Sequence, residues 1–296
     1  MLRVNAAGPH EFAGTPLGNS RGTPYGGLTL AHAALAADLT VGPALSLTSL
    51  SARFLAPGDA SRIVLHAVEE VHSGRSVASR RVVSHQNDTT LVDTSALFQR
   101  RNLANVEART DDATEVDATT WSIDDLPGPL DDDERRWLAG RIDWSPFEVR
   151  FPNTPPLALQ VGTQDGAGRY QAWLRPRSPL AASSRAALQT VLVFASDLFL
   201  LSAAAPTYGP VHELQLITLS HAMWFHEAVL DSGWVLCQQE LIWSRDGQVC
   251  CRGSLHDTRG RLLATTVQEG IVRTKTREGG YGVGEGRQHP ASAASG

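Results

Sequence analysis

A chain of 296 residues is long enough for two domains of ordinary size, or for one large unit built from two similar halves. Hydrophobic residues make up 42% of the sequence and charged residues 19%, which is typical of a soluble globular protein with a substantial core. The net charge of −5 argues against nucleic acid as a main partner, because phosphate backbones repel acidic proteins.

The cysteines and the apolar stretches predict the compartment. The cysteines of the chain are Cys237, Cys250 and Cys251. Their odd number and spacing suggest no metal site, so we expect reduced thiols in a cytoplasmic protein. The first twelve residues lack the apolar run of a secretion signal. The most apolar stretch, 186–205, is interrupted by polar residues, so it predicts a buried helix and no membrane partner.

Residues 1–101 predict an N-terminal domain made of a helix followed by antiparallel strands. The turn Tyr25-Gly26-Gly27 precedes an Ala- and Leu-rich stretch, 28–41, which has no helix breaker until Gly42-Pro43. Turns that contain Gly, Pro, Asn or Asp separate the strand-like runs that follow. These runs are 45–54, 62–71, 76–85 and 90–100.

Residues 102–141 are rich in Asp and Glu, so we expect an acidic, solvated linker with a short helix near 132–139. Residues 142–275 predict a C-terminal domain that repeats the order of the first, with a long apolar helix at 181–204. Its predicted strands are 147–151, 168–174, 214–225, 234–243, 248–256 and 262–272. Residues 276–296 are rich in Gly, Ser and Ala and predict a disordered tail.

This order of elements predicts an α+β fold. In each half a long helix would pack on the concave face of a curved, mostly antiparallel sheet. Two such units can join edge to edge into one longer sheet, an arrangement called a double hot-dog. The helices also share a local repeat, since Ala36-Ala37-Asp38-Leu39 resembles Ala195-Ser196-Asp197-Leu198.

Three polar residues in the last third of the chain stand among residues that are otherwise expected to be buried. They are Asp197, Thr218 and Gln268. A carboxylate, a hydroxyl and an amide can hold one water molecule from three sides. If the fold brings them together, they form a hydrolytic site that needs no Ser or Cys nucleophile, no metal and no cofactor.

The blocks around these residues resemble the acyl-CoA thioesterase II family of double hot-dog hydrolases, over residues 12–273. The resemblance rests on YGG and RFLAPGD in the first half, and on ASD, HAMWFH and VQEG in the second. It implies that Asp197, Thr218 and Gln268 are the catalytic residues. The sequence departs from the family pattern at Leu28, where Gln is usual, and at Ser220, where Asp is often found.

The resemblance implies hydrolysis of an acyl-CoA thioester to the free acid and CoA. Asp197 would be the general base, and burial on an apolar helix should raise its pKa. Thr218 and Gln268 would orient the water, while Gly26 and Gly27 would bind the substrate and its oxyanion at a helix start. His221 is expected to be structural, and Asp38 is not expected to form a second site.

Alternatives remain open at the level of sequence. The acyl group could arrive on a carrier protein instead of CoA, or the chain could bind acyl-CoA without turnover. A hot-dog hydratase is disfavoured because no suitable Asp and His pair lies on one helix. Arginines are candidates for binding the CoA phosphates, namely Arg80, Arg81, Arg100, Arg101, Arg252 and Arg273. By resemblance, we expect a homo-oligomer that acts in lipid metabolism.

Overall fold

The computed structural model describes residues 2–18, 22–100, 122, 132–152, 169–177, 185–226, 233–275 and 281–283. The helical elements are α1 (Gly26–Asp38), α2 (Asp132–Ile142), α3 (Arg185–Asp197), η2 (Leu200–Ala204), α4 (Ala205–Tyr208) and η3 (Val211–Glu213). The strands of the first half are β1 (Val4–Gly8), β2 (Glu11–Gly14), β3 (Ser46–Phe54), β4 (Val64–Ser73), β5 (Val77–Gln86) and β6 (Thr89–Gln99). Those of the second half are β7 (Phe147–Arg150), β8 (Arg169–Pro176), β9 (Leu214–Phe225), β10 (Val235–Arg245), β11 (Gln248–His256), β12 (Leu262–Lys275) and β13 (Tyr281–Val283).

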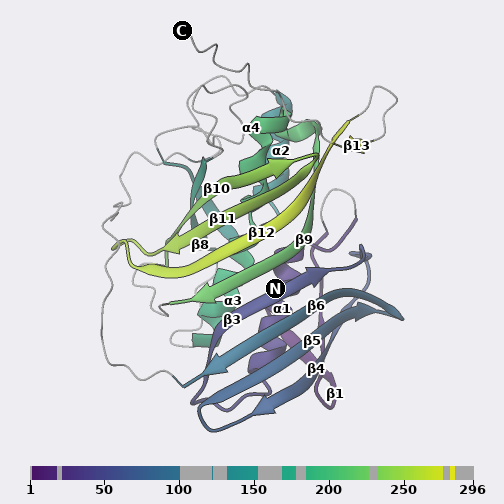
Figure 1. Ribbon diagram of the computed structural model, residues 1–296, viewed down its shortest axis with the longest axis vertical. Helices are drawn as coiled ribbons and strands as arrows, with labels where there is room; N and C mark the ends of the chain where they lie inside the picture. Colours follow the sequence, from purple (N-terminus) through teal and green to yellow (C-terminus); the bar gives the residue numbers. More distant parts are fainter. Residues whose placement is uncertain are drawn as a thin grey trace, which may run out of the picture.

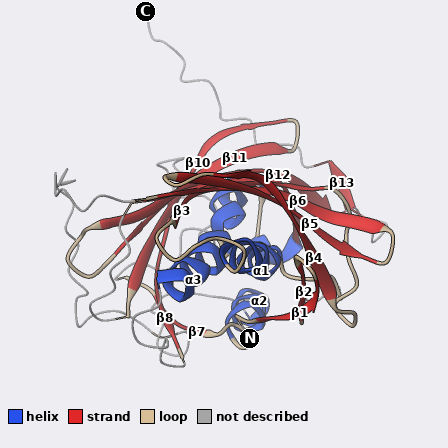
Figure 2. Cartoon of the chain, turned by 90° about the horizontal axis from the view of Figure 1, so that it is seen from below, coloured by secondary structure: helices blue, strands red, loops and turns tan. Residues whose placement is uncertain are grey.

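All of these strands belong to one curved antiparallel sheet of 13 strands (Figure 1). Its order is β1-β2-β4-β5-β6-β3-β9-β12-β11-β10-β8-β7, with β13 paired to β12. The strands of the two halves meet where β3 pairs with β9, from Ser49 opposite Trp224 to Arg53 opposite Ser220. Figure 2 shows the helices gathered on the concave side of this sheet. The predicted α+β class is therefore confirmed.

Helices α1 and α3 pack against each other inside the curve of the sheet. Almost every residue of α1 from Gly27 to Ala37 is buried, as is the run from Leu188 to Ser196 in α3. A helix that is apolar all round is typical of such a position. The stretch Arg185–Tyr208 is apolar enough to cross a membrane by composition alone, but 83% of its most apolar window is buried inside the protein.

Every strand predicted from the sequence is present, as β3 to β12, and the short acidic helix appears as α2. Strands β1 and β2 were not predicted. Strand β13 lies in the segment 276–296, for which disorder was expected. The linker residues 102–121 and 123–131, and the rest of that tail, lie outside the described residues.

The prediction of one continuous helix over 181–204 is wrong. Helix α3 ends at Asp197, and Phe199 then takes a left-handed conformation with φ 70°. A left-handed residue cannot continue an α-helix, so the chain turns into the short helices η2 and α4. As a consequence, Asp197 stands at the end of a helix and not in its middle.

A bulge in β9 controls which side chains face the helices. Gln268 of β12 lies opposite His221, but Gly270 lies opposite Thr218, so Leu219 is the extra residue. In a regular strand, residues three apart point to opposite faces. The extra residue shifts this alternation and turns both Thr218 and His221 toward α3.

Candidate active site

The structure brings together the three polar residues singled out from the sequence. Gln268 Nε2 donates hydrogen bonds to Asp197 Oδ1 at 2.9 Å and to Thr218 Oγ1 at 2.6 Å. Gln268 is only 1% exposed, whereas Asp197 and Thr218 are half-buried. Asp197 is therefore less buried than expected, because it stands where α3 ends and the cavity begins.

The backbone of α1 completes the surroundings of the carboxylate. The N–H of Gly27 donates to Asp197 Oδ2 at 2.7 Å, so each carboxylate oxygen accepts one N–H bond. Negative charge is unfavourable at the end of α3 but favourable at the start of α1, where backbone N–H groups are unpaired. The start of α1 thus offers the carboxylate a favourable partner at a position that the end of α3 alone would disfavour.

The close contact between the helices depends on glycine. A Cβ atom at position 27 would lie 2.8 Å from the Tyr25 ring and hydroxyl and 2.9 Å from Asp197 Cβ. At position 26 it would lie 3.1 Å from Phe54 and 3.2 Å from Asp197 Oδ2. Both predicted glycines therefore border the carboxylate. Gly27 binds Asp197 directly, so its N–H is not open to a substrate oxyanion.

Behind Gln268 lies a second polar layer, which the sequence did not predict as part of the site. His221 Nδ1 lies 3.1 Å from Gln268 Oε1, and His221 Nε2 lies 2.9 Å from Ser196 Oγ and 3.1 Å from Thr266 Oγ1. His221 is 1% exposed. Burial lowers the pKa of His221, against the opposing effects of Asp197 and Gln268, so the ring is neutral at pH 7.

Tyr25 is another neighbour that sequence reasoning treated only as part of a turn. Its ring centroid lies 4.9 Å from those of both Trp144 and Phe194, and its hydroxyl donates to the Phe194 carbonyl at 3.3 Å. Burial, and then the negative charge of Asp197, raise the pKa of Tyr25 well above its usual value. The phenol therefore remains a neutral wall of the site.

The polar cluster opens into a cavity of about 520 Å³. Asp197, Thr218, Gln268 and Gly26 all line it. Its other walls are mostly apolar and include Phe54, Leu55, Leu91, Val92, Leu201, Leu216 and Ile217. A cavity of this size with a few polar groups at one place is typical of a small-molecule site.

Asp38, the counterpart of Asp197 in the local repeat, lies elsewhere. It stands at the other end of the helix pair, where burial raises its pKa and the charge of Arg185 lowers it. Among the described residues, no Gln or Thr side chain hydrogen-bonds to Asp38. The repeated Ala-X-Asp motif therefore does not carry a repeated polar cluster with it.

The candidate arginines differ in what they contact. Arg80 is 3% exposed and serves the fold. Its guanidinium donates to Thr40 Oγ1 at 2.9 Å, to the Thr40 carbonyl at 3.0 Å and to the His72 carbonyl at 2.7 Å, and it lies 3.4 Å from Glu70 Oε2. A role for Arg80 in binding CoA phosphates is therefore ruled out by its contacts.

Other arginines are paired or border the cavity. Arg81 binds Asp93 through two hydrogen bonds, and Arg252 pairs with Glu240. Arg273, together with Arg141 of α2, lines the cavity. Arg101 lies outside the described residues. Arg273 is thus the candidate whose position fits an anionic substrate best.

The cysteines are free thiols, as expected. Burial raises the pKa of Cys237 and of Cys251 to about 12, so neither is a thiolate nucleophile at neutral pH. Within the described ranges, no three His, Cys, Asp or Glu side chains are grouped as metal ligands. The polar cluster at the cavity wall combines the carboxylate of Asp197 with the neutral hydrogen-bonding groups of Thr218 and Gln268, and Arg141 and Arg273 add positive charge to the lining.

Two protein-family models match the chain in succession. Residues 15–99 match an acyl-CoA thioesterase N-terminal domain, and residues 111–272 match an acyl-CoA thioesterase C-terminal domain. Acyl-CoA thioesterase 2 of Haemophilus influenzae is 30% identical over 270 residues, which cover 84% of this chain and 87% of that protein. Human acyl-coenzyme A thioesterase 8 is 25% identical over 260 residues, covering 85% and 81% respectively.

Solved structures show the same likeness. The acyl-CoA thioesterase II TesB2 of Mycobacterium marinum is similar with a TM-score of 0.69 and 27% identity, covering 92% of this chain and 96% of that one. A protein with a hot-dog fold from Alicyclobacillus acidocaldarius has a TM-score of 0.70 at 18% identity, with coverages of 93% and 97%. The fold of this chain is accordingly a hot-dog fold.

Proposed function

Because this chain belongs to the acyl-CoA thioesterase II family, we propose that it hydrolyses acyl-CoA with a water molecule held by Asp197, Thr218 and Gln268. The chain is a thioester hydrolase, and the residues assigned to the reaction are the proposal. The observation that carries it is the hydrogen-bonded set of Asp197, Gln268 and Thr218 at the wall of one cavity, with the N–H of Gly27 bound to Asp197.

The hydrogen bonds within this set leave a donor and acceptors available to bind a water molecule. Each oxygen of Asp197 accepts one N–H bond and keeps a further lone pair for a water proton. Thr218 Oγ1 accepts from Gln268, so its own O–H proton is available to another acceptor. A water between Asp197 and Thr218 would thus donate to the carboxylate while accepting from the hydroxyl.

In the proposed reaction, Asp197 takes a proton from this water as its oxygen attacks the thioester carbonyl carbon. The new C–O bond gives a tetrahedral intermediate with a negative oxygen. When the C–S bond breaks, that oxygen re-forms the carbonyl, and the sulfur leaves with the electron pair and takes the proton from Asp197. The products are the free acid and the CoA thiol.

The start of α1 is the proposed place for the oxyanion. Gly26 lines the cavity and precedes Gly27, whose N–H is engaged with Asp197. Backbone N–H groups in the first turn have no partner within the helix. We assign the N–H of Gly26 to the oxyanion, with Gly27 reassigned to holding the base. An oxyanion donor typically contributes about 3 kcal/mol to transition-state stabilisation.

The substrate is proposed to be acyl-CoA rather than an acyl chain on a carrier protein. The apolar cavity walls suit the acyl chain, and Arg273 suits an anionic group at the cavity. Both kinds of substrate present the same thioester, so only their relative turnover distinguishes them. Turnover of the carrier-bound acyl chain alone would replace CoA by the carrier as the partner.

The finer architecture and setting are proposals as well. We take the halves 1–101 and 142–275 as two hot-dog units, because α1 packs beside β4, β5 and β6 of its own half and α3 contacts β11 of its own half, besides β3 at the junction of the halves. A cytoplasmic homo-oligomer that acts in lipid metabolism remains an expectation. Light scattering of the purified protein would give the number of chains.

The test of the proposed base is Asp197→Asn, which keeps the shape of the side chain but removes the charge. We expect kcat for release of free thiol from a panel of acyl-CoAs to fall at least about a hundredfold, because general-base catalysis is lost. Circular dichroism and retained binding of a non-hydrolysable acyl-CoA analogue would show that the fold and the cavity persist. Equal thiol release by the wild type and Asp197→Asn would refute the assignment of the base. Binding without turnover in the wild type would indicate a non-catalytic acyl-CoA-binding protein.

A further inference from the structure

The amide of Gln268 works only in one of its two orientations. An ionised carboxylate accepts hydrogen bonds and cannot donate, so the amide nitrogen of Gln268 must face Asp197. The same nitrogen reaches Thr218 Oγ1 at 2.6 Å. The amide oxygen consequently points away from the cavity, toward His221 Nδ1 at 3.1 Å.

This orientation determines where His221 carries its proton. Gln268 Oε1 accepts only, so His221 Nδ1 must bear the hydrogen and donate it. In the neutral ring, Nε2 is then an acceptor that requires one donated proton. Ser196 Oγ and Thr266 Oγ1 both lie within reach, at 2.9 Å and 3.1 Å.

The two hydroxyls meet this requirement together. Ser196 Oγ also lies 2.8 Å from the Val193 carbonyl, and Thr266 Oγ1 lies 3.0 Å from the Ala222 carbonyl. One hydroxyl can donate to His221 while the other donates to its carbonyl. The ring is therefore held as the Nδ1–H tautomer by groups on α3 and β12, in a place that is closed to solvent.

We propose that His221 is a positioning residue that fixes the amide of Gln268, and through it the donors offered to Asp197 and Thr218. If the amide turned over, its oxygen would face the carboxylate and its N–H groups would face the Nδ1–H of His221. That state loses the hydrogen bonds to Asp197 and His221, and the Thr218 hydroxyl would have to donate its proton to the amide oxygen instead of to the water. The inference rests on the proposed function, because it concerns the geometry of the water-binding set.

Two substitutions separate this role from a purely structural one. His221→Asn places an amide nitrogen where Nδ1 was and keeps a donor to Gln268. His221→Gln places its amide near the former Nε2 and keeps contact with Ser196 and Thr266 instead. We expect His221→Asn to retain kcat within about threefold and His221→Gln to lose about tenfold or more, the effect of one lost hydrogen bond. KM should change little in both.

The matched control is His66, a buried histidine on β4 of the first half. His66 Nδ1 lies 2.9 Å from Ser84 Oγ, so His66→Asn and His66→Gln make the same chemical changes in a similarly closed environment. Neither control should change kcat for thiol release. A fall in kcat in the controls equal to that in His221→Gln would show that any buried histidine matters equally, which would overturn the inference.

Nitrogen NMR of histidine-labelled protein gives an independent reading of the tautomer, with the His221 signals identified among the 10 histidines by their absence in His221→Asn. A neutral His221 ring protonated at Nδ1 is expected, whereas protonation at Nε2 or a charged ring at pH 7 would overturn the inference.

Equal kcat of the two His221 variants, or a higher kcat in His221→Gln than in His221→Asn, would also overturn the inference. If Asp197→Asn also remained active, the proposed function would fail first. If Asp197→Asn is inactive and both His221 variants match the wild type, only the positioning role fails.

Discussion

At the scale of the residue, the site depends on a carboxylate that belongs to two helices at once. Asp197 ends α3, where its charge is unfavourable, yet it accepts the N–H of Gly27 at the start of α1. Gly27 makes this possible because any side chain there would collide with Tyr25 and Asp197. Glycine occupies this position although it is less favourable in a helix than alanine by about 1 kcal/mol.

Gly27→Ala should therefore have the opposite sign to an ordinary glycine-to-alanine change in a helix. The new Cβ would lie within 2.9 Å of Asp197 Cβ and must displace α1 or the carboxylate. We expect kcat to fall about tenfold or more and the melting temperature to drop, as measured by thiol release and by thermal unfolding.

The control for that variant is Gly42→Ala, where nothing lies within 4 Å of an added Cβ. Its activity and melting temperature should match the wild type. A Gly27→Ala protein that is as active as the wild type and more stable would show that the helices part without cost. The inference that the site depends on close contact between α1 and α3 would then be wrong.

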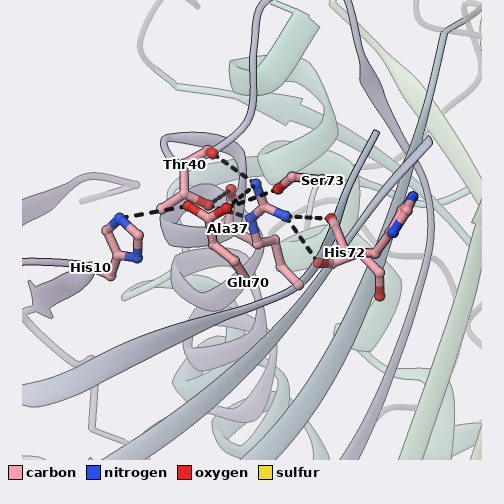
Figure 3. A network of polar contacts seen from close by, with 8 residues as sticks. His10, Ala37, Thr40, Glu70, His72 and Ser73 are labelled. Carbon is pink, nitrogen blue, oxygen red and sulfur yellow. Dashed lines mark hydrogen bonds and ion pairs between the residues drawn. The ribbon is translucent and has the colours of Figure 1, made fainter. Parts of the chain in front are cut away.

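At the scale of the element, the end of α1 is fixed by a buried guanidinium. Arg80 of β5 binds the Thr40 carbonyl and hydroxyl. That hydroxyl in turn donates to the Ala37 carbonyl at 2.8 Å (Figure 3). A cation at the end of a helix satisfies carbonyl groups that lack partners and complements the helix dipole. The same Arg80 reaches Glu70 and the His72 carbonyl on β4, so it joins helix and sheet.

Arg80→Lys should lower the free energy of unfolding by about 2 kcal/mol, because a single ammonium group cannot replace the planar fork of donors. Urea unfolding followed by circular dichroism measures this change. Arg81→Lys is the control on the neighbouring position, where the ion pair with Asp93 is exposed and its loss should cost less than about 1 kcal/mol. Equal effects of the two substitutions would contradict the inference that Arg80 joins the end of α1 to the sheet.

At the scale of the whole molecule, stability should depend on pH through the core of the first half. His66 of β4 is fully buried against His32 of α1, with ring centroids 5.7 Å apart. Burial, and then the charges of His32 and His85, lower the pKa of His66 from 6.5 to about 3. The folded protein thus keeps this ring neutral, whereas the unfolded chain binds a proton near pH 6.5.

Because the folded pKa is the lower one, this contribution to stability is complete above about pH 6.5 and is lost as the pH falls toward 3. We expect the free energy of unfolding to decrease by about 1 kcal/mol per pH unit between pH 6.5 and 5 from this residue. Urea unfolding at several pH values measures the slope. His66→Asn should flatten it, and an unchanged slope in this variant would show that other groups are responsible.

Much of this architecture was accessible from sequence because its signals are local. The Gly- and Asp-containing turns delimit the strands β3 to β12, and the Ala- and Leu-rich run marks α1. Asp197, Thr218 and Gln268 were found because each is polar among apolar neighbours. Their convergence at one cavity wall agrees with the proposed set.

What sequence reasoning missed depends on contacts between distant residues. The break after Asp197 is invisible in an apolar run, because Phe199 takes a left-handed conformation only under tertiary constraint. The bulge at Leu219 emerges only once β9 is paired with β12. The role of Gly27 as a partner of Asp197 joins residues 170 positions apart. His221 could have been suspected from its strand position once the register opposite Gln268 was known.

The pairing of β3 with β9 joins the two halves into one sheet, and this bears on how the two halves can evolve. The backbone N–H of Gly27 that binds Asp197 comes from the other half of the polypeptide, so neither half contains the complete proposed site. Because the two halves lie on one chain, they meet intramolecularly, at a high effective concentration. Two separate fragments would have to associate from solution to form the same contact. The covalent joining of the halves therefore guarantees one-to-one supply of both contributions.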